Sequence, residues 1–132
     1  MQDWQLPHSD PVSVATGLLD AVSRHDQNYI DKHVDLSGQA IAFIHRSGRV
    51  DLKRASLYDY VRSDPEAPPF VETLSLSSAV IQGPFATVSG TYVYAVHTLT
   101  EHCGDISISL FNTQGTWKIN QVQWTVHWQG CQ

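Results

Sequence analysis

The chain has 132 residues, 42% of them hydrophobic, which suits one compact domain with a single core and is too little for two. Its formal net charge of -5, from 8 Lys and Arg against 13 Asp and Glu, offers no basic stripe to follow a phosphate backbone, so we expect no nucleic-acid partner. No apolar run approaches the roughly 20 residues that cross a bilayer, so we expect no membrane partner either.

The first nine residues lack the basic and apolar regions of a signal peptide. We expect residues 1–9 to be a flexible segment ahead of a single domain, with the whole chain, 1–132, forming one unit. As it stands the chain is expected to be cytoplasmic, and it would be exported if a leader had been removed.

Two helices are predicted at the start of the domain. Asp10 can accept hydrogen bonds from free backbone N–H groups, and Pro11 suits a first helical position because it has no N–H to satisfy. Asp26 is placed to cap a second, shorter helix over 26–34. One face of the first helix is apolar at helical spacing and comprises Val12, Ala15, Leu18, Leu19 and Val22.

A short hairpin and a third helix follow. Residues 39–45 alternate as in a strand, and the chain returns over 49–52 after an Arg-Ser-Gly turn. Ser56, with Asp59 three residues later, predicts the start of a third helix, which the proline-rich segment 64–69 should end.

The rest of the chain predicts strands and turns. Four stretches read as an antiparallel meander, with the segment 100–103 among its turns: 70–81, 86–97, 104–111 and 116–128. The even-numbered residues from Ala86 to Val96 should face the helices. The apolar phase changes within the last stretch, which predicts a bulge near Asn120 and Gln121, and a sheet bent there leaves a pocket beneath the helices.

This order of elements, together with the G-x-W-K-I pattern at 115–119, resembles the nuclear transport factor 2-like superfamily from Asp10 onward. More narrowly, His102-Cys103-Gly104 and Gly130-Cys131 resemble the SnoaL-like, lumazine-binding-like small proteins of that superfamily. The resemblance implies an α+β, cone-shaped fold, with three N-terminal helices and a short hairpin packed on a strongly curved antiparallel sheet that encloses a cavity. Members include cyclases, isomerases, dehydratases, epoxide hydrolases and many proteins without catalytic activity.

Acid/base chemistry in such a cavity needs side chains that titrate near neutral pH. His102 shares the parity of Ile106 in its strand and should point inward, although it could equally brace the loop beside it. Tyr92 and Tyr94 also point to the helix side, where a phenol can donate to a developing oxyanion or simply pack in the core. His45 is the second acid/base candidate if the phase of Ile41 and Phe43 carries it inside, and otherwise it is a solvated end residue.

Aromatic residues are the candidates for contacts with a substrate. Trp124 is interpreted as a cavity wall whose flat face suits a polycyclic ligand, and Tyr29, Tyr58 and Phe43 are further candidates. Cys103 and Cys131 form either one disulfide, in an oxidising compartment, or two thiols.

Neither a metal nor a cofactor is expected. The seven histidines lack the spacing of a metal-binding helix. The epoxide-hydrolase variant of the superfamily uses an Asp-Arg-Asp arrangement around a water. Arg46, Arg49, Asp51 and Asp59 supply the residue types, but nothing in their spacing brings them together.

The sequence therefore predicts a cofactor-independent enzyme that performs cyclisation, isomerisation, dehydration or epoxide opening on a hydrophobic, oxygenated small molecule, as in natural-product biosynthesis. The alternatives are a non-catalytic small-molecule-binding module and a dimerisation domain of the same fold. We also expect a homodimer, formed through an outer sheet face of small residues: Thr87, Ser89, Thr91, Val93 and Ala95.

Overall fold

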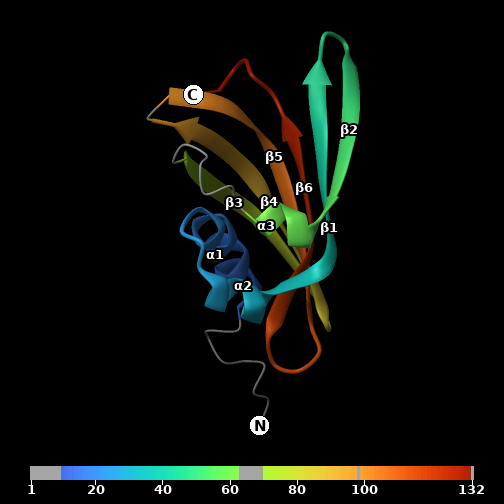
Figure 1. Cartoon of the computed structure of the whole chain (residues 1–132). Helices are drawn as coiled ribbons and strands as arrows, with labels where there is room; N and C mark the ends of the chain where they lie inside the picture. The colour runs from blue at the N-terminus through green and yellow to red at the C-terminus, as the bar shows by residue number, and fades with distance from the viewer. Residues whose placement is uncertain (1–9, 63–69, 98, 132) are drawn as a thin grey trace.

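A computed structural model describes residues 10–62, 70–97 and 99–131 (Figure 1). The predicted flexible segment 1–9 and the helix-ending segment 64–69 lie outside the described residues. The helices are α1 (Pro11–Ser23), α2 (Gln27–His33) and α3 (Leu57–Val61). The strands are β1 (Val34–Arg46), β2 (Arg49–Ser56), β3 (Phe70–Gln82), β4 (Phe85–Val96), β5 (Leu99–Asn112) and β6 (Trp117–Val126).

The six strands form one sheet in the order β2-β1-β6-β5-β4-β3. Strands β1 and β6 run parallel and every other neighbouring pair is antiparallel, so the sheet is mixed and the expectation of a wholly antiparallel sheet is wrong. The reason is that the chain crosses to the far edge after β2, and the meander β3–β6 then returns to the free edge of β1. The sheet is twisted but not strongly curled, unlike the expected cone, and the helices lie on one of its faces (Figure 1).

Two irregularities face each other where β1 meets β6. In β6, Gln121 pairs with Ser109 and Ile119 pairs with Leu110, so Asn120 is an extra residue and the predicted bulge is confirmed. The β1–β6 register shifts at the same level, between Val34 and Gln39. A Cβ on Gly38 would lie 2.1 Å from the backbone oxygen of Asn120, so only glycine allows this approach.

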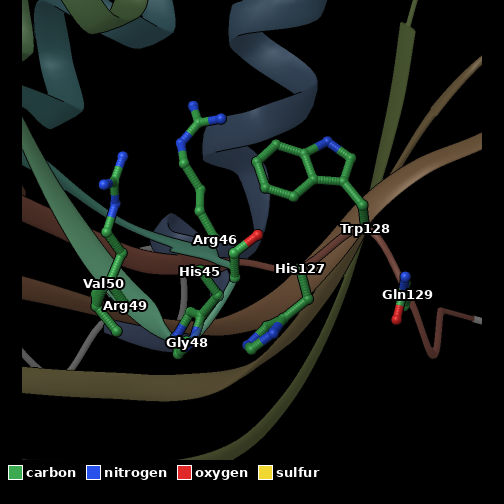
Figure 2. Close-up of a pocket in the computed structure, with 9 residues that line it drawn as sticks. His45, Arg46, Gly48, Arg49, Val50, His127, Trp128 and Gln129 are labelled. Atoms are coloured by element: carbon green, nitrogen blue, oxygen red, sulfur yellow. The ribbon is translucent and has the colours of Figure 1, made fainter.

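The β1–β2 hairpin is longer than the sequence predicts and extends beyond the helices. Arg46 pairs with Arg49 across a turn at Gly48, whose φ of 84° favours glycine. Figure 2 shows the guanidinium groups of Arg46 and Arg49 on one side of this hairpin end and the imidazoles of His45 and His127 on the other.

Strand β5 begins at Leu99, five residues earlier than predicted, so the segment 100–103 is strand and not turn. The physical reason is a long-range pairing: Cys103 and His127 exchange two backbone hydrogen bonds of 2.9 Å, which give this polar segment a partner just beyond the end of β6. The β4–β5 register also contains a bulge. Tyr94 pairs with His102 and Ala95 pairs with Thr100, so β5 has one extra residue at this point.

The core lies between α1 and the inner face of the sheet. The inward orientation predicted for β4 is confirmed, since Ala86, Val88 and Tyr92 are each at most 2% exposed. From α1, Ala15, Leu18, Leu19 and Val22 are buried as predicted, together with Val14. Within the described chain, no helix has the length and apolar character needed to cross a membrane.

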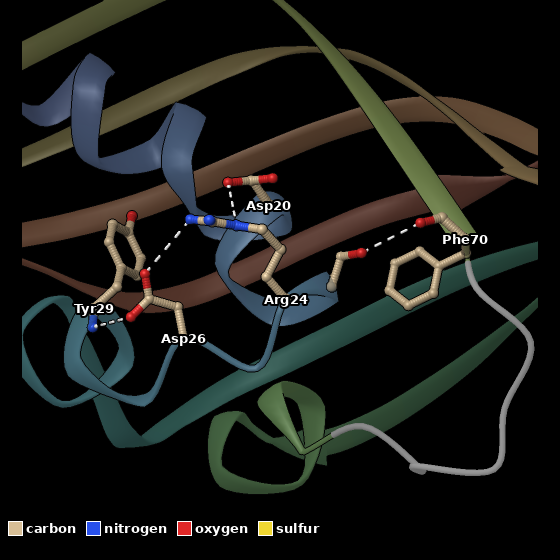
Figure 3. Close-up of polar contacts among 6 residues, drawn as sticks. Asp20, Arg24, Asp26, Tyr29 and Phe70 are labelled. Carbon is tan, nitrogen blue, oxygen red and sulfur yellow. Dashed lines mark hydrogen bonds and ion pairs between the residues drawn. The ribbon is translucent and has the colours of Figure 1, made fainter.

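Polar contacts at the helix ends hold α1 and α2 in place (Figure 3). Asp26 caps α2 by accepting from the backbone N–H of Tyr29 at 3.2 Å. The guanidinium of Arg24 binds Asp26 at 3.6 Å and Asp20 at 3.0 Å. At the end of α1, the hydroxyl of Ser23 donates to the backbone oxygen of Phe70 at 3.2 Å, which ties the helix to the first residue of β3.

Candidate functional site

A pocket of about 360 Å³ opens on the helix-covered face of the sheet, and we call it the interior pocket. All six strands and α3 contribute to its wall. Its apolar residues are Ala42, Ile44, Ile106, Trp124 and Val126. Its polar residues are Lys53, Tyr60, Glu72, Tyr92, Tyr94 and His102. An apolar pocket with several converging polar groups is the usual form of a small-molecule site.

A carboxyl, a phenol and an imidazole form one row across three strands in this pocket. Tyr94 pairs with Glu72 of β3 on one side and with His102 of β5 on the other. The rings of Tyr94 and His102 stack, with centroids 4.6 Å apart and planes at 10°. The other face of Tyr94 is packed by Phe70, at 5.2 Å between centroids. The row thus places one proton carrier, Glu72 or His102, on each side of the Tyr94 phenol.

The hydrogen bonds of Tyr92 determine the tautomer of His102. The Tyr92 hydroxyl donates to the backbone oxygen of Thr125 at 2.7 Å and lies 3.0 Å from Nδ1 of His102. A phenol has one hydrogen, and here the carbonyl takes it, so Nδ1 must donate to the Tyr92 oxygen. Nε2 of His102 therefore carries the lone pair. Tyr92 positions the imidazole, and its own hydroxyl is already engaged.

Burial changes the acidity of the groups in the row. It raises the pKa of the Glu72 carboxyl to about 7, because the charged form is poorly solvated there. It lowers the pKa of His102, an effect that the charge of Glu101 partly opposes. The pKa of Tyr94 is raised by burial first and then by Glu72 and Glu101. Near pH 7, Glu72 is present in both protonation states and His102 is mostly neutral.

Tyr60 and Trp124 form an aromatic wall of the interior pocket. Their ring centroids lie 5.3 Å apart, so the α3 side chain covers the β6 side chain. Burial, and then the charge of Glu72, raises the pKa of Tyr60. The structure thus places Trp124 on the pocket wall, where a flat ligand would contact it.

Phe43 and His45 lie on the opposite face of the sheet, so the expected inward orientation of His45 is wrong. Ala42 and Ile44 line the interior pocket, and alternate residues of a strand point to opposite faces. His45 stacks on His127 instead, with centroids 4.1 Å apart. Apolar residues occupy both phases of β1, so the sequence pattern could not decide which phase faces inward.

Tyr29 and Tyr58 also lie outside the interior pocket. The Tyr29 hydroxyl donates to the backbone oxygen of Val14, and its ring lies 4.9 Å from that of His33, so it joins α2 to α1. Tyr58 is 51% exposed on α3, where the guanidinium of Arg62 lies 5.0 Å from its ring centroid.

Cys103 and Cys131 are joined by a disulfide, with a Cα–Cα distance of 5.7 Å. The bridge ties β5 to the chain that leaves β6, next to His102. The adjacent Gly104 lets the two strands approach closely, since a Cβ there would lie 2.1 Å from the backbone oxygen of Thr125. The Thr125 hydroxyl accepts from the backbone N–H of Asp105 at 2.9 Å.

The four charged residues considered for an Asp-Arg-Asp arrangement do not come together. Asp51 lies between Arg46 and Arg49, at 3.3 and 3.2 Å, whereas Asp59 binds Arg62 at 3.8 Å on α3. Two arginines therefore share one carboxylate. Across the described ranges, no group of three or more His, Cys, Asp and Glu residues is placed to hold a metal ion.

The sequence-based candidates omit three polar residues of the interior pocket: Lys53, Tyr60 and Glu72. Glu72 had a detectable signal. It shares the phase of Phe70, Leu74 and Leu76, which pack against the core, so it is an acidic residue on an apolar strand face. A charged residue in that phase is costly unless it has a function or a partner.

Comparison with protein-family models and with curated proteins finds no match. Solved structures do match over most of their length. A cystatin-like-fold protein of unknown function from Nostoc punctiforme is 15% identical, with TM-score 0.61, over 93% of this chain and 92% of that one. An NTF-2-like protein of unknown function from Silicibacter pomeroyi is 18% identical, with TM-score 0.57, over 92% and 100%.

The S. rosetta CaMKII hub is 14% identical, with TM-score 0.65, over 88% of this chain and 93% of that one. Identities this low establish similarity of fold and say nothing about activity. The order of helices and strands, the mixed six-stranded sheet and these matches together show that the chain has the nuclear transport factor 2-like fold.

Proposed function

We propose that the protein is a cofactor-independent enzyme that moves protons on a hydrophobic, oxygenated small molecule, as an isomerase, cyclase, dehydratase or epoxide hydrolase does. The observation that carries the proposal is the row Glu72, Tyr94 and His102 inside an otherwise largely apolar pocket. A filled core without converging polar groups would instead have favoured a purely structural domain.

Each residue of the row has a distinct role in this proposal. Nε2 of His102 takes a proton from the carbon beside a substrate carbonyl. The electron pair of that C–H bond moves toward the carbonyl oxygen, and the Tyr94 hydroxyl donates a hydrogen bond to the developing oxyanion. Among the described residues the Tyr94 hydroxyl forms no hydrogen bond to another protein group, whereas the hydroxyl of Tyr92 already donates to the backbone oxygen of Thr125.

Glu72 completes the transfer. Its protonated carboxyl gives a proton to a second carbon of the conjugated system, which restores the carbonyl and shifts the double bond. The cycle closes when His102 releases its proton to solvent and Glu72 takes one up. A carboxyl with a pKa of about 7 suits this role because it donates and recovers a proton near neutral pH.

Deuterium exchange tests the proposal without a known substrate. The purified protein is incubated in D₂O with a panel of polycyclic ketones, including β,γ-unsaturated ones, and carbon-bound deuterium and double-bond migration are followed by NMR. We expect catalysed exchange in the wild type. His102→Ala should reduce it roughly a hundredfold or more, and Tyr94→Phe and Glu72→Gln should each also reduce it substantially.

The matched control is His97→Ala, which removes an exposed imidazole from the turn after β4, outside the interior pocket. It should exchange at the wild-type rate. Circular dichroism establishes that each variant is folded. A protein that binds members of the panel but exchanges none of them would support the non-catalytic binding module instead.

A further inference from the structure

We propose that the substrate carries a carboxylate, which Arg46 and Arg49 bind at the hairpin end of the interior pocket; the inference rests on the proposed function. A second pocket, of about 530 Å³, lies between the β1–β2 turn and the chain after β6, and we call it the hairpin pocket. It is lined on one side by Arg46, Arg49 and Trp128.

The strand register places the hairpin pocket next to the interior pocket. Ile44 pairs with Val126, and both line the interior pocket. Two residues further along the same face, Arg46 is therefore level with Trp128. Their contact agrees with this, since the Arg46 guanidinium lies 5.4 Å from the Trp128 ring centroid. To reach the arginines, a ligand in the interior pocket would extend about two residues further along β1 and β6.

One carboxylate holds both arginines in place. Nε of Arg46 lies 3.3 Å from one oxygen of Asp51, and Nε of Arg49 lies 3.2 Å from the other. These ion pairs use Nε and not the terminal amino groups, which keep donors for a further acceptor. Figure 2 shows both guanidinium groups on the same side of the hairpin. Asp51 is thus a positioning residue for a two-arginine clamp.

The local charge favours an anion although the whole chain has a net charge of -5. Two guanidinium groups face one carboxylate, so the clamp retains a positive charge. Lys53, two residues from Asp51 and on the wall of the interior pocket, adds a further cation. Guanidinium donors match the two oxygens of a carboxylate, and the face of Trp128 suits a flat ring attached to it.

A ligand that contacts both the two-arginine clamp and His102 must cross β6. Arg46 is on β1 and His102 is on β5, with β6 between them, so the two strands are about 10 Å apart. A substrate held at both points therefore reaches across β6, with its carboxylate at one end and the carbon that loses a proton at the other. The substrate class that would use both the clamp and the interior pocket is a fused-ring keto acid.

Binding of a matched pair of probes tests the inference. Naphthoic acid and naphthamide have the same ring system and differ in charge. By isothermal titration calorimetry at low salt, the acid should bind the wild type at least about tenfold more tightly than the amide. Arg46→Gln and Arg49→Gln should each reduce this preference, and the double variant should abolish it. Arg24→Gln, whose arginine pairs with Asp20 and Asp26 beside α1, is the matched control and should keep it.

Equal binding of acid and amide by the wild type, or a preference that survives in the double variant, would overturn the inference. Tighter binding of naphthyl phosphate than of naphthoic acid would overturn the choice of carboxylate. The two proposals fail separately. If the protein exchanges deuterium into neutral ketones but binds naphthoic acid no more tightly than naphthamide, only the two-arginine clamp is wrong. If it prefers the acid but exchanges deuterium into no ketone or keto acid, only the enzymatic function is wrong.

Discussion

Nδ1 of His102 donates a hydrogen bond of 3.0 Å to the hydroxyl of Tyr92, which in turn donates to a backbone carbonyl. These two hydrogen bonds leave Nε2 of His102 as the basic nitrogen. The side chain that supplies the oxygen, Tyr92, is only 2% exposed, so the imidazole is oriented by the core of the protein.

Replacing Tyr92 by Phe tests this arrangement. The variant loses both hydrogen bonds of the hydroxyl, and we expect the free energy of unfolding to fall by about 1–2 kcal/mol. The histidine should then populate both neutral tautomers, which ¹⁵N NMR of the imidazole detects, and turnover should fall. Tyr29→Phe removes a phenol-to-carbonyl bond far from the pocket and should lose stability without any change in the His102 tautomer. An unchanged tautomer in Tyr92→Phe would contradict the assignment.

The rate of proton transfer should have a bell-shaped dependence on pH. The proposed mechanism needs neutral His102, whose pKa is lowered from 6.5, and protonated Glu72, whose pKa is about 7. The rate should therefore rise through the pKa of His102, reach a maximum below pH 7 and fall as Glu72 ionises. In Glu72→Gln the falling limb near pH 7 should be absent. Retention of that limb in the variant would assign it to another group.

Glu72 should also make stability depend on pH. Its pKa is raised from 4.5 to about 7 on folding, so the folded state binds more protons than the unfolded state between these values. Stability therefore falls as pH rises through this window, by an amount of order 2–3 kcal/mol. The lowered pKa of His102 acts in the opposite direction below pH 6.5.

Comparison of variants separates the two groups. The free energy of unfolding is measured by urea denaturation for the wild type and for Glu72→Gln. From pH 5 to pH 8, the variant should become progressively more stable relative to the wild type. The groups that share the pocket with Glu72 (Lys53, Tyr60, Tyr92, Tyr94 and His102) are present in both proteins. Glu101→Gln, at an exposed position of β5, provides the control, and an equal trend in both variants would rule out Glu72 as the cause.

The disulfide should stabilise the fold where the compartment is oxidising. It closes a loop with a sequence separation of 28, for which removal costs about 2–4 kcal/mol. Intact-chain mass spectrometry should show a gain of two hydrogen atoms on reduction, and thermal unfolding should shift to lower temperature. The stability of Cys131→Ser should not depend on reductant, and it should equal that of the reduced wild type. Free thiols in protein purified under oxidising conditions would contradict the bridge.

The outer face of β4 is proposed to form a homodimer. Its residues Thr87, Ser89, Thr91, Val93 and Ala95 are small and only mildly polar, and they share the face opposite the helices. Light scattering at micromolar concentration should give twice 14.7 kDa. Thr91→Arg should give a monomer, whereas Tyr58→Arg, on exposed α3, should remain dimeric. A wild-type monomer would refute the proposal.

The sequence alone determined the features that depend on neighbouring residues. Asp10 and Ser56 cap their helices as predicted, by accepting from Val12 and Asp59, because capping is decided within three residues. The inward phase of Tyr92 and the bulge at Asn120 also followed from local patterns, since strand alternation and its interruption are visible in the chain itself. Cys103 and Cys131 could be named but not joined, because bridging depends on a distance in space.

Only the tertiary structure decided how distant segments meet. The parallel pairing of β1 with β6 determined that Ala42 and Ile44, and not Phe43 and His45, face the interior pocket, and both phases of β1 are apolar enough to be buried. The row of Glu72, Tyr94 and His102 exists because β4 lies between β3 and β5 in a register set by long-range hydrogen bonds. No local propensity encodes that register, so the site became visible only when the strands were paired.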